Sequence, residues 1–318
     1  MKNSNSEKLS KGDIISFITL MLLGVFVFLG MNFKTLGDKI TSAFVAILLL
    51  ILMFTSVFLA AYAKAQNPNE SGWKKLEYAM VVLYLLTMIP SYLFVAKFFD
   101  VQFEKKEIIK EVEQELSDIN ELFVSYKRQC ESRTTNYQTE LEAMLKSVEG
   151  RRQIVQTLGL EKQPKDLSSE DVEGAVDSFR RFLTGGQEYH NLQKEKEALG
   201  ESCKQGFQNW DILFIPQYAL ELGNAKERFA EQLQQIFMEP KSPLESNVPQ
   251  FETGNSKEAC SVEKRFSDSV GFSFLGFLAL IVLGGLGMCK YILGKKSDIV
   301  KVKGGDASVI TNGGGIRI

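Results

Sequence analysis

Long apolar runs with few or no charges lie near both ends of the chain. Runs 14–33 and 40–63 carry no charge, run 76–99 carries only Glu77 and Lys97, and run 270–293 carries only Lys290. An apolar stretch of about 20 residues is long enough to cross a bilayer as a helix. The pattern therefore predicts four transmembrane helices. The first run has no small-residue cleavage site, so we expect it to be retained and not removed as a signal peptide.

A polar segment with helical periodicity separates the third and fourth runs. Apolar or semi-apolar residues recur there at alternating spacings of three and four, which is typical of a coiled-coil face. They are Ile109, Val112, Leu116, Ile119, Phe123, Tyr126, Cys130, Tyr137, Leu141, Met144, Val148, Val155 and Leu158, interrupted only by Arg133 and Arg151. No turn signal precedes this face, so the third membrane helix is expected to continue into water. Low helix propensity at 134–136 and at Gly150 predicts that the segment then folds partly back on itself.

Three further helices are predicted in the polar segment. Ser168 and Asp171 form a helix-start pattern before the apolar face of Val172, Val176, Phe179 and Leu183. Later helices are expected at 188–206 and 217–238, and the proline-containing stretch 239–256 indicates a linker. The predicted fold is an all-α membrane protein with four transmembrane helices and a large extracytoplasmic helical or coiled-coil domain between the third and fourth. The expected divisions are tail 1–13, spans 14–99, stalk 100–269, span 270–293 and flexible tail 294–318.

Charge is distributed unevenly along the chain. Segment 100–269 holds 22 Lys and Arg against 32 Asp and Glu, and the remainder holds 15 against 7. An acidic segment argues against nucleic-acid binding, because phosphates need basic partners. The first tail, second loop and last tail hold 12 basic residues, whereas the first loop holds 2. The positive-inside rule therefore places both termini in the cytoplasm and segment 100–269 outside, in what we interpret as a bacterial inner membrane.

The sequence offers little catalytic chemistry. Its one histidine, His190, lies in a polar helical stretch, and no CxxC, HxxxH, GxxxxGK[ST] or GxGxxG spacing occurs. We expect no catalytic residue, no metal and no cofactor. Glu77, Lys97 and Lys290 lie near span ends, where they can snorkel to water, and this placement argues against a carrier.

The cysteines could form disulfides in an oxidising compartment. One hypothesis joins Cys130 to Cys203 and leaves Cys260 to link two subunits. The alternative is that all three are buried free thiols.

A dense apolar stretch, 209–216, interrupts the polar segment. It has two interpretations: it closes one end of the helical domain, or it exposes an anchor for another protein. The anchor residues would be Trp210, Ile212, Leu213 and Phe214.

Small residues in the second and fourth spans predict close helix packing. They are Ser56, Ala60, Gly284, Gly285 and Gly287.

Three functions fit these features. The first is a non-enzymatic scaffold or assembly subunit of a multiprotein envelope complex, which binds partners through its stalk and forms homo-oligomers. The others are an oligomeric channel and a receptor that relays a periplasmic signal to a cytoplasmic partner. The layout is similar in outline to tetraspanins, but their Cys-Cys-Gly motif is missing. It also resembles the polytopic inner-membrane subunit of Bacteroidetes type VI secretion complexes, over the overall layout only, which implies a role in protein secretion.

Overall fold

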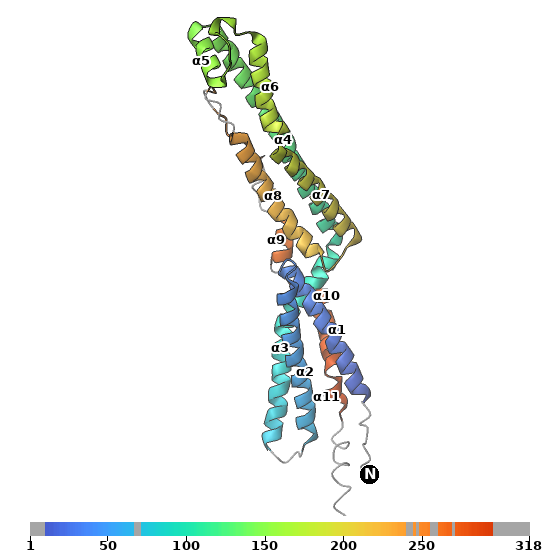
Figure 1. Cartoon of the computed structure of the whole chain (residues 1–318). Coiled ribbons are helices and arrows are strands. Elements are labelled where there is room, and N and C mark those ends of the chain that lie inside the picture. Colours follow the sequence, from blue (N-terminus) through green and yellow to red (C-terminus); the bar gives the residue numbers. More distant parts are fainter. Residues whose placement is uncertain are drawn as a thin grey trace, which may run out of the picture. The chain divides into compact units, whose positions relative to one another are not determined.

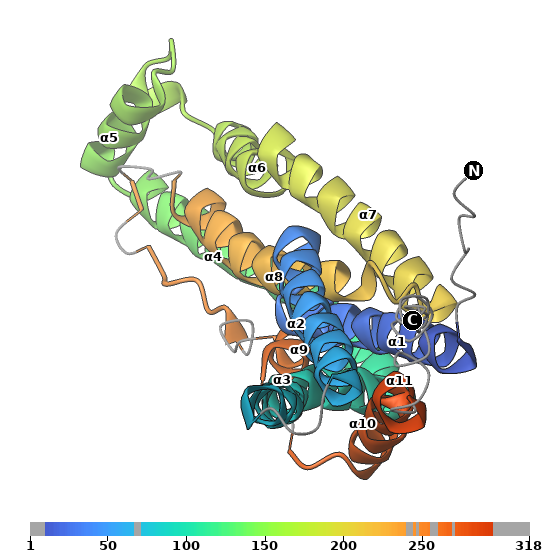
Figure 2. The same ribbon diagram turned by 90° about the horizontal axis from the view of Figure 1, so that it is seen from below.

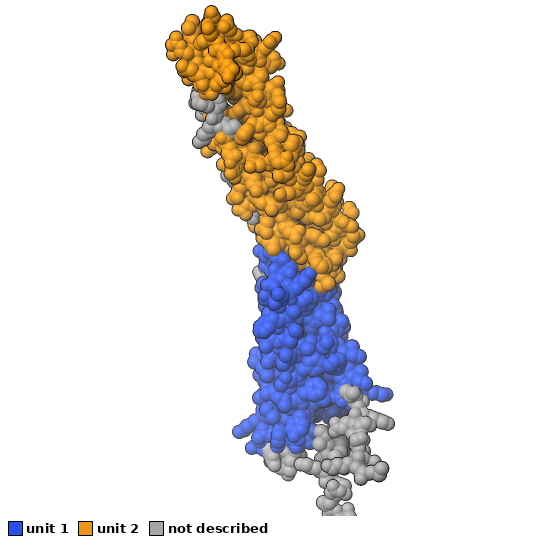
Figure 3. Space-filling view, viewed as in Figure 1, with its two compact units in different colours: residues 1–105, 267–318 blue, residues 106–266 orange. Residues whose placement is uncertain are grey.

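The computed structural model describes residues 10–66, 71–239, 244–245, 248–254, 260–268 and 271–294. The chain divides into unit 1, residues 1–105 and 267–318, and unit 2, residues 106–266 (Figure 3). All regular elements among the described residues are helices. The predicted all-α class is therefore confirmed. Of the two predicted tails, residues 1–9 and 295–318 lie outside the described residues, whereas 11–13 already belong to the first helix.

Unit 1 contains three helices that are long and apolar enough to cross a membrane. They are α1 (Lys11–Lys34), α2 (Lys39–Ala65) and α3 (Ser71–Phe103). In the described part of this unit they are followed by α10 (Phe274–Gly287) and α11 (Cys289–Leu293). The end view in Figure 2 shows α10 beside α1 and α3, which it contacts. α1 begins with a capping box between Ser10 and Asp13, and the Asp38 carboxylate caps α2.

The fourth predicted span differs from expectation because it is two helices. α10 ends at Gly287, and the Met288 N–H is shared among the carbonyls of Gly284, Gly285 and Leu286. Three glycines within four residues lower helix propensity at this point. The 14 residues of α10 cover about 21 Å at about 1.5 Å each, less than the roughly 30 Å of a hydrocarbon core. A single continuous helix over 270–293 is therefore not what the structure shows.

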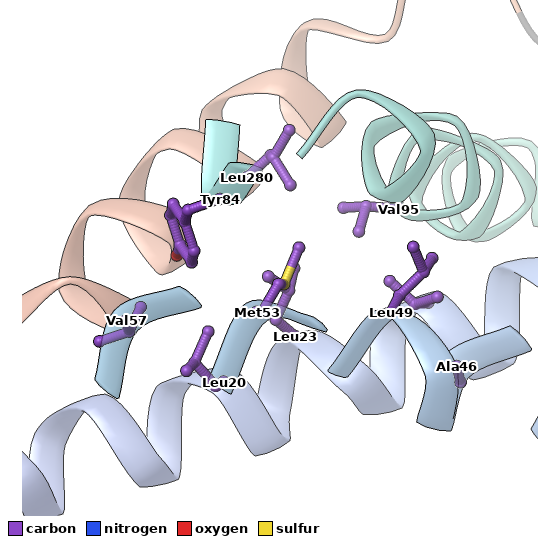
Figure 4. Close-up of a cluster of buried hydrophobic side chains, with 10 residues drawn as sticks. Leu20, Leu23, Ala46, Leu49, Met53, Val57, Tyr84, Val95 and Leu280 are labelled. Atoms are coloured by element: carbon purple, nitrogen blue, oxygen red, sulfur yellow. The ribbon is translucent and has the colours of Figure 1, made fainter. Parts of the chain in front are cut away.

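Unit 1 has apolar side chains on its outside and small polar side chains inside, a distribution that is expected of membrane-spanning helices. Large apolar side chains cover its outside, among them Ile40, Phe44 and Ile89 at 85%, 68% and 63% exposure. Small polar side chains are buried instead: Ser16, Thr19, Ser42, Ser56, Thr87 and Ser91. Figure 4 shows the apolar cluster between the helices, formed by Leu20, Leu23, Val27, Ala46, Leu49, Met53, Val57, Tyr84, Val95 and Leu280. This arrangement is consistent with a lipid-facing exterior.

The predicted packing residues have different surroundings. Ser56, Ala60, Gly284 and Gly287 are buried, and the Tyr84 hydroxyl donates to the Gly284 carbonyl at 2.8 Å. Gly285 is exposed, and a Cβ added there would meet nothing within 4 Å. The glycine cluster therefore packs through its first and last members, because Gly285 lies on the other side of the helix.

Two closer contacts were not predicted. A Cβ at Gly30 of α1 would collide with the Phe94 carbonyl of α3, and one at Gly276 of α10 would lie 2.6 Å from the Ala96 Cα, also of α3. Backbone atoms cannot move aside as a side-chain end can. These two glycines therefore set the separation of α1 and α10 from α3.

Gly30→Ala is expected to destabilise unit 1 by about 1–3 kcal/mol, because the added methyl group overpacks against the backbone of α3. Thermal unfolding of the full chain in detergent, followed by circular dichroism, measures the effect. Gly285→Ala is the matched control, since open space surrounds that position. Equal midpoints for the two variants would contradict the close contact.

Unit 2 contains the predicted helices, with small shifts in their bounds. The predicted ones are α4 (Lys105–Leu145), α6 (Ser169–Gly185), α7 (Gln187–Asn209) and α8 (Ile215–Met238). Three elements were not predicted separately: α5 (Val148–Leu158), the short 3-10 helix η1 (Pro164–Asp166) and α9 (Ser261–Ser267). Figure 1 shows α4, α7 and α8 side by side along the unit. Only Glu104 separates α3 from α4, and its N–H still donates to the Asp100 carbonyl at 3.0 Å, so the helix predicted to continue past the third apolar run is interrupted at a single residue.

α4 has 41 residues and continues through the threonines at which we expected weak helix formation. The hydroxyls of Thr134 and Thr135 donate to the carbonyls of Cys130 and Glu131, four residues earlier, at 2.7 and 2.9 Å. Their side chains are thereby satisfied within the helix. The first break comes after Leu145.

The predicted apolar face of α4 is buried against helices of the same chain. Ring centroids lie 4.7 Å apart between Tyr137 and Phe179 of α6, and 5.5 Å apart between Phe123 and Phe229 of α8. Near the start of α4 the buried face is shifted by one position: Ile108 and Glu115 are buried in place of Ile109 and Leu116. The face is thus covered within unit 2.

Candidate functional site

An ionic cluster joins α4, α8 and α9, and we call it the α4–α9 clamp. It consists of Glu111, Glu115, Lys226, Ser261 and Arg265. One Glu115 oxygen accepts from the Ser261 N–H at 2.7 Å and from its hydroxyl at 2.8 Å, and the other accepts from the Lys226 ammonium at 2.7 Å. Glu115 therefore satisfies an N–H group at the start of α9, where a helix favours negative charge.

The inner pair of the clamp is almost fully removed from water. The side chains of Lys226 and Glu115 are 4% and 6% exposed, and Asp118 lies 3.8 Å from the same ammonium. Burial raises the pKa of Glu115, but the hydrogen bonds from Lys226 and Ser261 outweigh it and hold the pKa below its usual value. Glu115 is accordingly a charged group at neutral pH, compensated by Lys226.

The second half of the clamp lies one helical turn earlier on α4. Arg265 of α9 donates to both Glu111 oxygens, from Nε at 3.0 and 3.1 Å and from Nη2 at 2.5 Å to one of them. Glu107, a further turn back, lies 3.8 Å from the same guanidinium. Such forked contacts between arginine and carboxylate fix orientation as well as distance. α9 is therefore held to α4 at both of its ends.

A glycine on α8 allows α9 to lie close. A Cβ at Gly223 would meet the Glu263 carboxylate and lie 3.4 Å from the Cys260 Cβ. Val262 and Phe266 bury the apolar side of α9 at 0% exposure. This short helix, which precedes α10 by six residues, is consequently fixed by both ionic and apolar contacts.

Arg133 forms a separate buried site. Its guanidinium makes two 2.6 Å bonds to the Glu245 carboxylate and donates to the Phe237 carbonyl. The rings of Phe179 and Phe237 lie 5.1 and 5.2 Å from it. Arg133 is fully buried, so it attaches the segment around Glu245 to α4.

The three cysteines of unit 2 are buried free thiols in the structure. Cys130 lies by Tyr126 and Arg133, whereas the Cys203 sulfur lies 4.0 Å from the Tyr218 carbonyl and near Cys260. The predicted bond between Cys130 and Cys203 is absent here, since the two have different neighbours. Cys260, at 3% exposure, would have to leave its site before it could link two subunits.

These thiols are expected to resist alkylation by iodoacetamide at pH 8 in the folded chain. Burial raises the pKa to about 11 for Cys130 and Cys260 and to about 12 for Cys203, so the reactive thiolate is scarce until the pH approaches those values. Mass spectrometry after urea unfolding without reductant should show all four cysteines labelled. Labelling of only two would instead support the predicted disulfide.

The apolar stretch 209–216 forms the turn between α7 and α8. Trp210 is 9% exposed and adopts a positive φ of 52°, while Leu213 and Phe214 are 42% and 41% exposed. Ile212 is half-buried. The two interpretations therefore apply to different residues: Trp210 closes this end of unit 2, and Leu213 and Phe214 reach its surface.

Three further residues considered in the sequence are His190, Lys290 and Lys97, and each has different surroundings in the structure. His190 is exposed, and among the described residues no group of three or more His, Cys, Asp or Glu side chains could hold a metal ion. Lys290 pairs with Asp13 at 2.8 Å. Lys97 does not snorkel to water as expected; it is 4% exposed and donates to the Asp268 carbonyl at 3.1 Å.

Comparisons with known proteins were negative. No family model, curated protein or solved structure matches the chain.

Proposed function

We propose that the chain is a non-enzymatic scaffold of a multiprotein envelope complex, anchored by its apolar helices and binding partners through unit 2. In this proposal unit 2 lies outside a bacterial inner membrane, both termini are cytoplasmic, and α10 with α11 forms the fourth span. The layout resemblance to type VI secretion complexes makes secretion machinery the first candidate for the assembly.

The α4–α9 clamp is the observation that carries this proposal. α4 follows a membrane helix after one residue, α9 precedes the last apolar helix by six, and buried ionic bonds hold the two together. The clamp therefore joins the two helices at which the chain enters and leaves unit 2. A scaffold needs such a rigid attachment in order to hold its binding partners in a defined geometry.

In-cell crosslinking tests the scaffold. The tagged full chain is treated with a lysine-reactive crosslinker in its host, purified in mild detergent and analysed by mass spectrometry. We expect a reproducible set of envelope proteins at fixed stoichiometry, with crosslinks concentrated on residues 106–266. A chain that purifies as a lone monomer without crosslinks to other proteins would contradict the proposal.

The clamp also favours a second candidate, a signal relay. A partner that binds unit 2 and separates α9 from α4 would free the segment that leads into α10. Hydrogen exchange of the Ser261–Ser267 amides distinguishes the two functions. A scaffold keeps them protected when partners bind, whereas a relay loses that protection.

A further inference from the structure

A small cavity lies in unit 1 among the end of α1, the later part of α3 and the segment before α10. It has a volume of about 80 Å³, enough for several waters or one phosphate-sized group. Its lining residues are Lys34, Tyr92, Leu93, Ala96, Lys97, Asp268 and Gly271. The cavity is separate from the α4–α9 clamp, which lies in unit 2.

The lining favours an anion. Lys34 and Lys97 contribute two positive charges against the single carboxylate of Asp268. The Lys97 ammonium is directed to this site by its bond to the Asp268 carbonyl, and Asp268 itself is exposed at the rim. Two lysine side chains that line one cavity favour phosphate by simple charge complementarity.

Tyr92 adds a neutral donor. Its hydroxyl oxygen accepts the Ser273 N–H at 3.0 Å, which leaves the hydroxyl proton to donate to an anion. Ser273 is also the N-cap of α10, so the positive end of that helix faces the same region.

The position of the cavity indicates that the anion belongs to a lipid. Lys34 follows the uncharged run of α1, where an apolar helix meets the headgroup region. From Leu93 at the cavity, an exposed apolar stripe follows α3 at spacings of four and three: Ile89, Leu86 and Val82, at 52–63% exposure. An acyl chain can lie along this stripe while its headgroup occupies the cavity.

We propose that this cavity binds the phosphate of an anionic phospholipid, with Lys34 and Lys97 as the charged contacts and the α3 stripe as the acyl-chain surface. A soluble phosphate ester has the same phosphate chemistry as the lipid headgroup, but it has no acyl chain to lie along the α3 stripe. A lipid and a soluble ester therefore differ in whether binding requires an acyl chain.

Native mass spectrometry of the full chain, exchanged into equal mixtures of phosphatidylglycerol and phosphatidylcholine, tests the proposal. The natural chain should retain phosphatidylglycerol preferentially, and Lys34→Gln should reduce the preference about fivefold. Lys97→Gln is expected to reduce the preference as well. Because Lys34 is exposed, the Lys34→Gln variant should keep the fold. Lys39→Gln, at the start of α2 and outside the cavity lining, is the charge-matched control.

Three outcomes would overturn the inference. They are no preference for phosphatidylglycerol in the natural chain, an equal loss in Lys39→Gln, and displacement of the lipid by glycerol 3-phosphate at a concentration equal to that of the lipid. The last result would identify a soluble phosphate ester as the ligand. Retained preference in Lys39→Gln together with loss in Lys34→Gln supports the lipid site.

Discussion

Glu115→Ala is expected to lower the free energy of unfolding of unit 2 by about 3–5 kcal/mol, because it leaves the Lys226 ammonium buried without its carboxylate. The Ser261 N–H and hydroxyl lose their acceptor in the same change. The first loss acts on α8, which carries Lys226, and the second acts on the start of α9. The variant should therefore also expose the amides of α9 to hydrogen exchange before the rest of unit 2 unfolds.

The measurement can be made in the full chain. In a Trp73→Phe background, Trp210 is the only tryptophan left, and its fluorescence reports denaturant unfolding of unit 2. Glu113→Ala is the matched control, since Glu113 is an exposed carboxylate on the same helix. An equal effect of the two substitutions would show that general charge loss, not the buried pair, causes the destabilisation.

A double variant distinguishes the interaction between Glu115 and Lys226 from the cost of leaving one buried charge unpaired. Glu115→Leu with Lys226→Met replaces both charges by apolar groups of similar volume, so no unpaired charge remains. We expect its unfolding free energy to exceed that of either single variant, with a coupling energy of about 0.5–3 kcal/mol. Purely additive losses would mean that the two side chains do not interact.

The same pair predicts a dependence on pH. The pKa of Glu115 is lower in the folded chain than its usual 4.5, so the folded state keeps its carboxylate ionised where the unfolded state binds a proton. Its contribution is present above about pH 4.5 and is lost as the pH falls through the folded pKa. Glu115→Ala should therefore narrow the stability difference between pH 6 and pH 3.

The helices could be predicted because their signals are local. Ser168 and Asp171 predicted the start of α6, and they form its capping box. The four apolar residues assigned to one face of that helix are the four that are buried. Three of the four apolar runs likewise form helices long enough to span a membrane. Capping and periodicity depend on neighbours within a turn or two, which the sequence contains directly.

The clamp could not be predicted because its signal is not local. Glu115 is one of many acidic residues on α4, and its sequence context predicts an exposed, hydrated carboxylate. Its partners Lys226 and Ser261 lie 111 and 146 residues away in the sequence. Only the fold brings them together. Gly30 was missed for the same reason, since a glycine in an apolar run says nothing about which backbone approaches it.

The partner of the apolar face of α4 is not encoded in the spacing of its residues. Its spacing correctly predicted burial at Phe123, Tyr126 and Leu141, yet it could not say whether the partner helices came from this chain or another. In unit 2 aromatic side chains of α6, α7 and α8 cover it. Homo-oligomers would therefore have to form through other surfaces, and among the exposed apolar side chains of unit 2 are Phe182, Leu213 and Phe214.

Arg133→Met is expected to lower the free energy of unfolding of unit 2 by about 3–5 kcal/mol. Arg133 occupies a position where the seam pattern favours an apolar residue, and it is tolerated only because Glu245 and the Phe237 carbonyl satisfy it. Methionine fills similar space, but it leaves the Glu245 carboxylate, 4% exposed, without its partner. The same Trp210 fluorescence assay measures the loss.

Arg128→Met, at an exposed position on the same helix, is the control and should change stability by less than about 0.5 kcal/mol. Adding Glu245→Gln to Arg133→Met removes the stranded charge and should restore part of the loss. This combination tests whether the arginine is needed for its charge or only for its volume. A single Arg133→Met variant as stable as the natural chain would show that Glu245 reaches water when unpaired, and the attachment of that segment to α4 would then contribute little to folding.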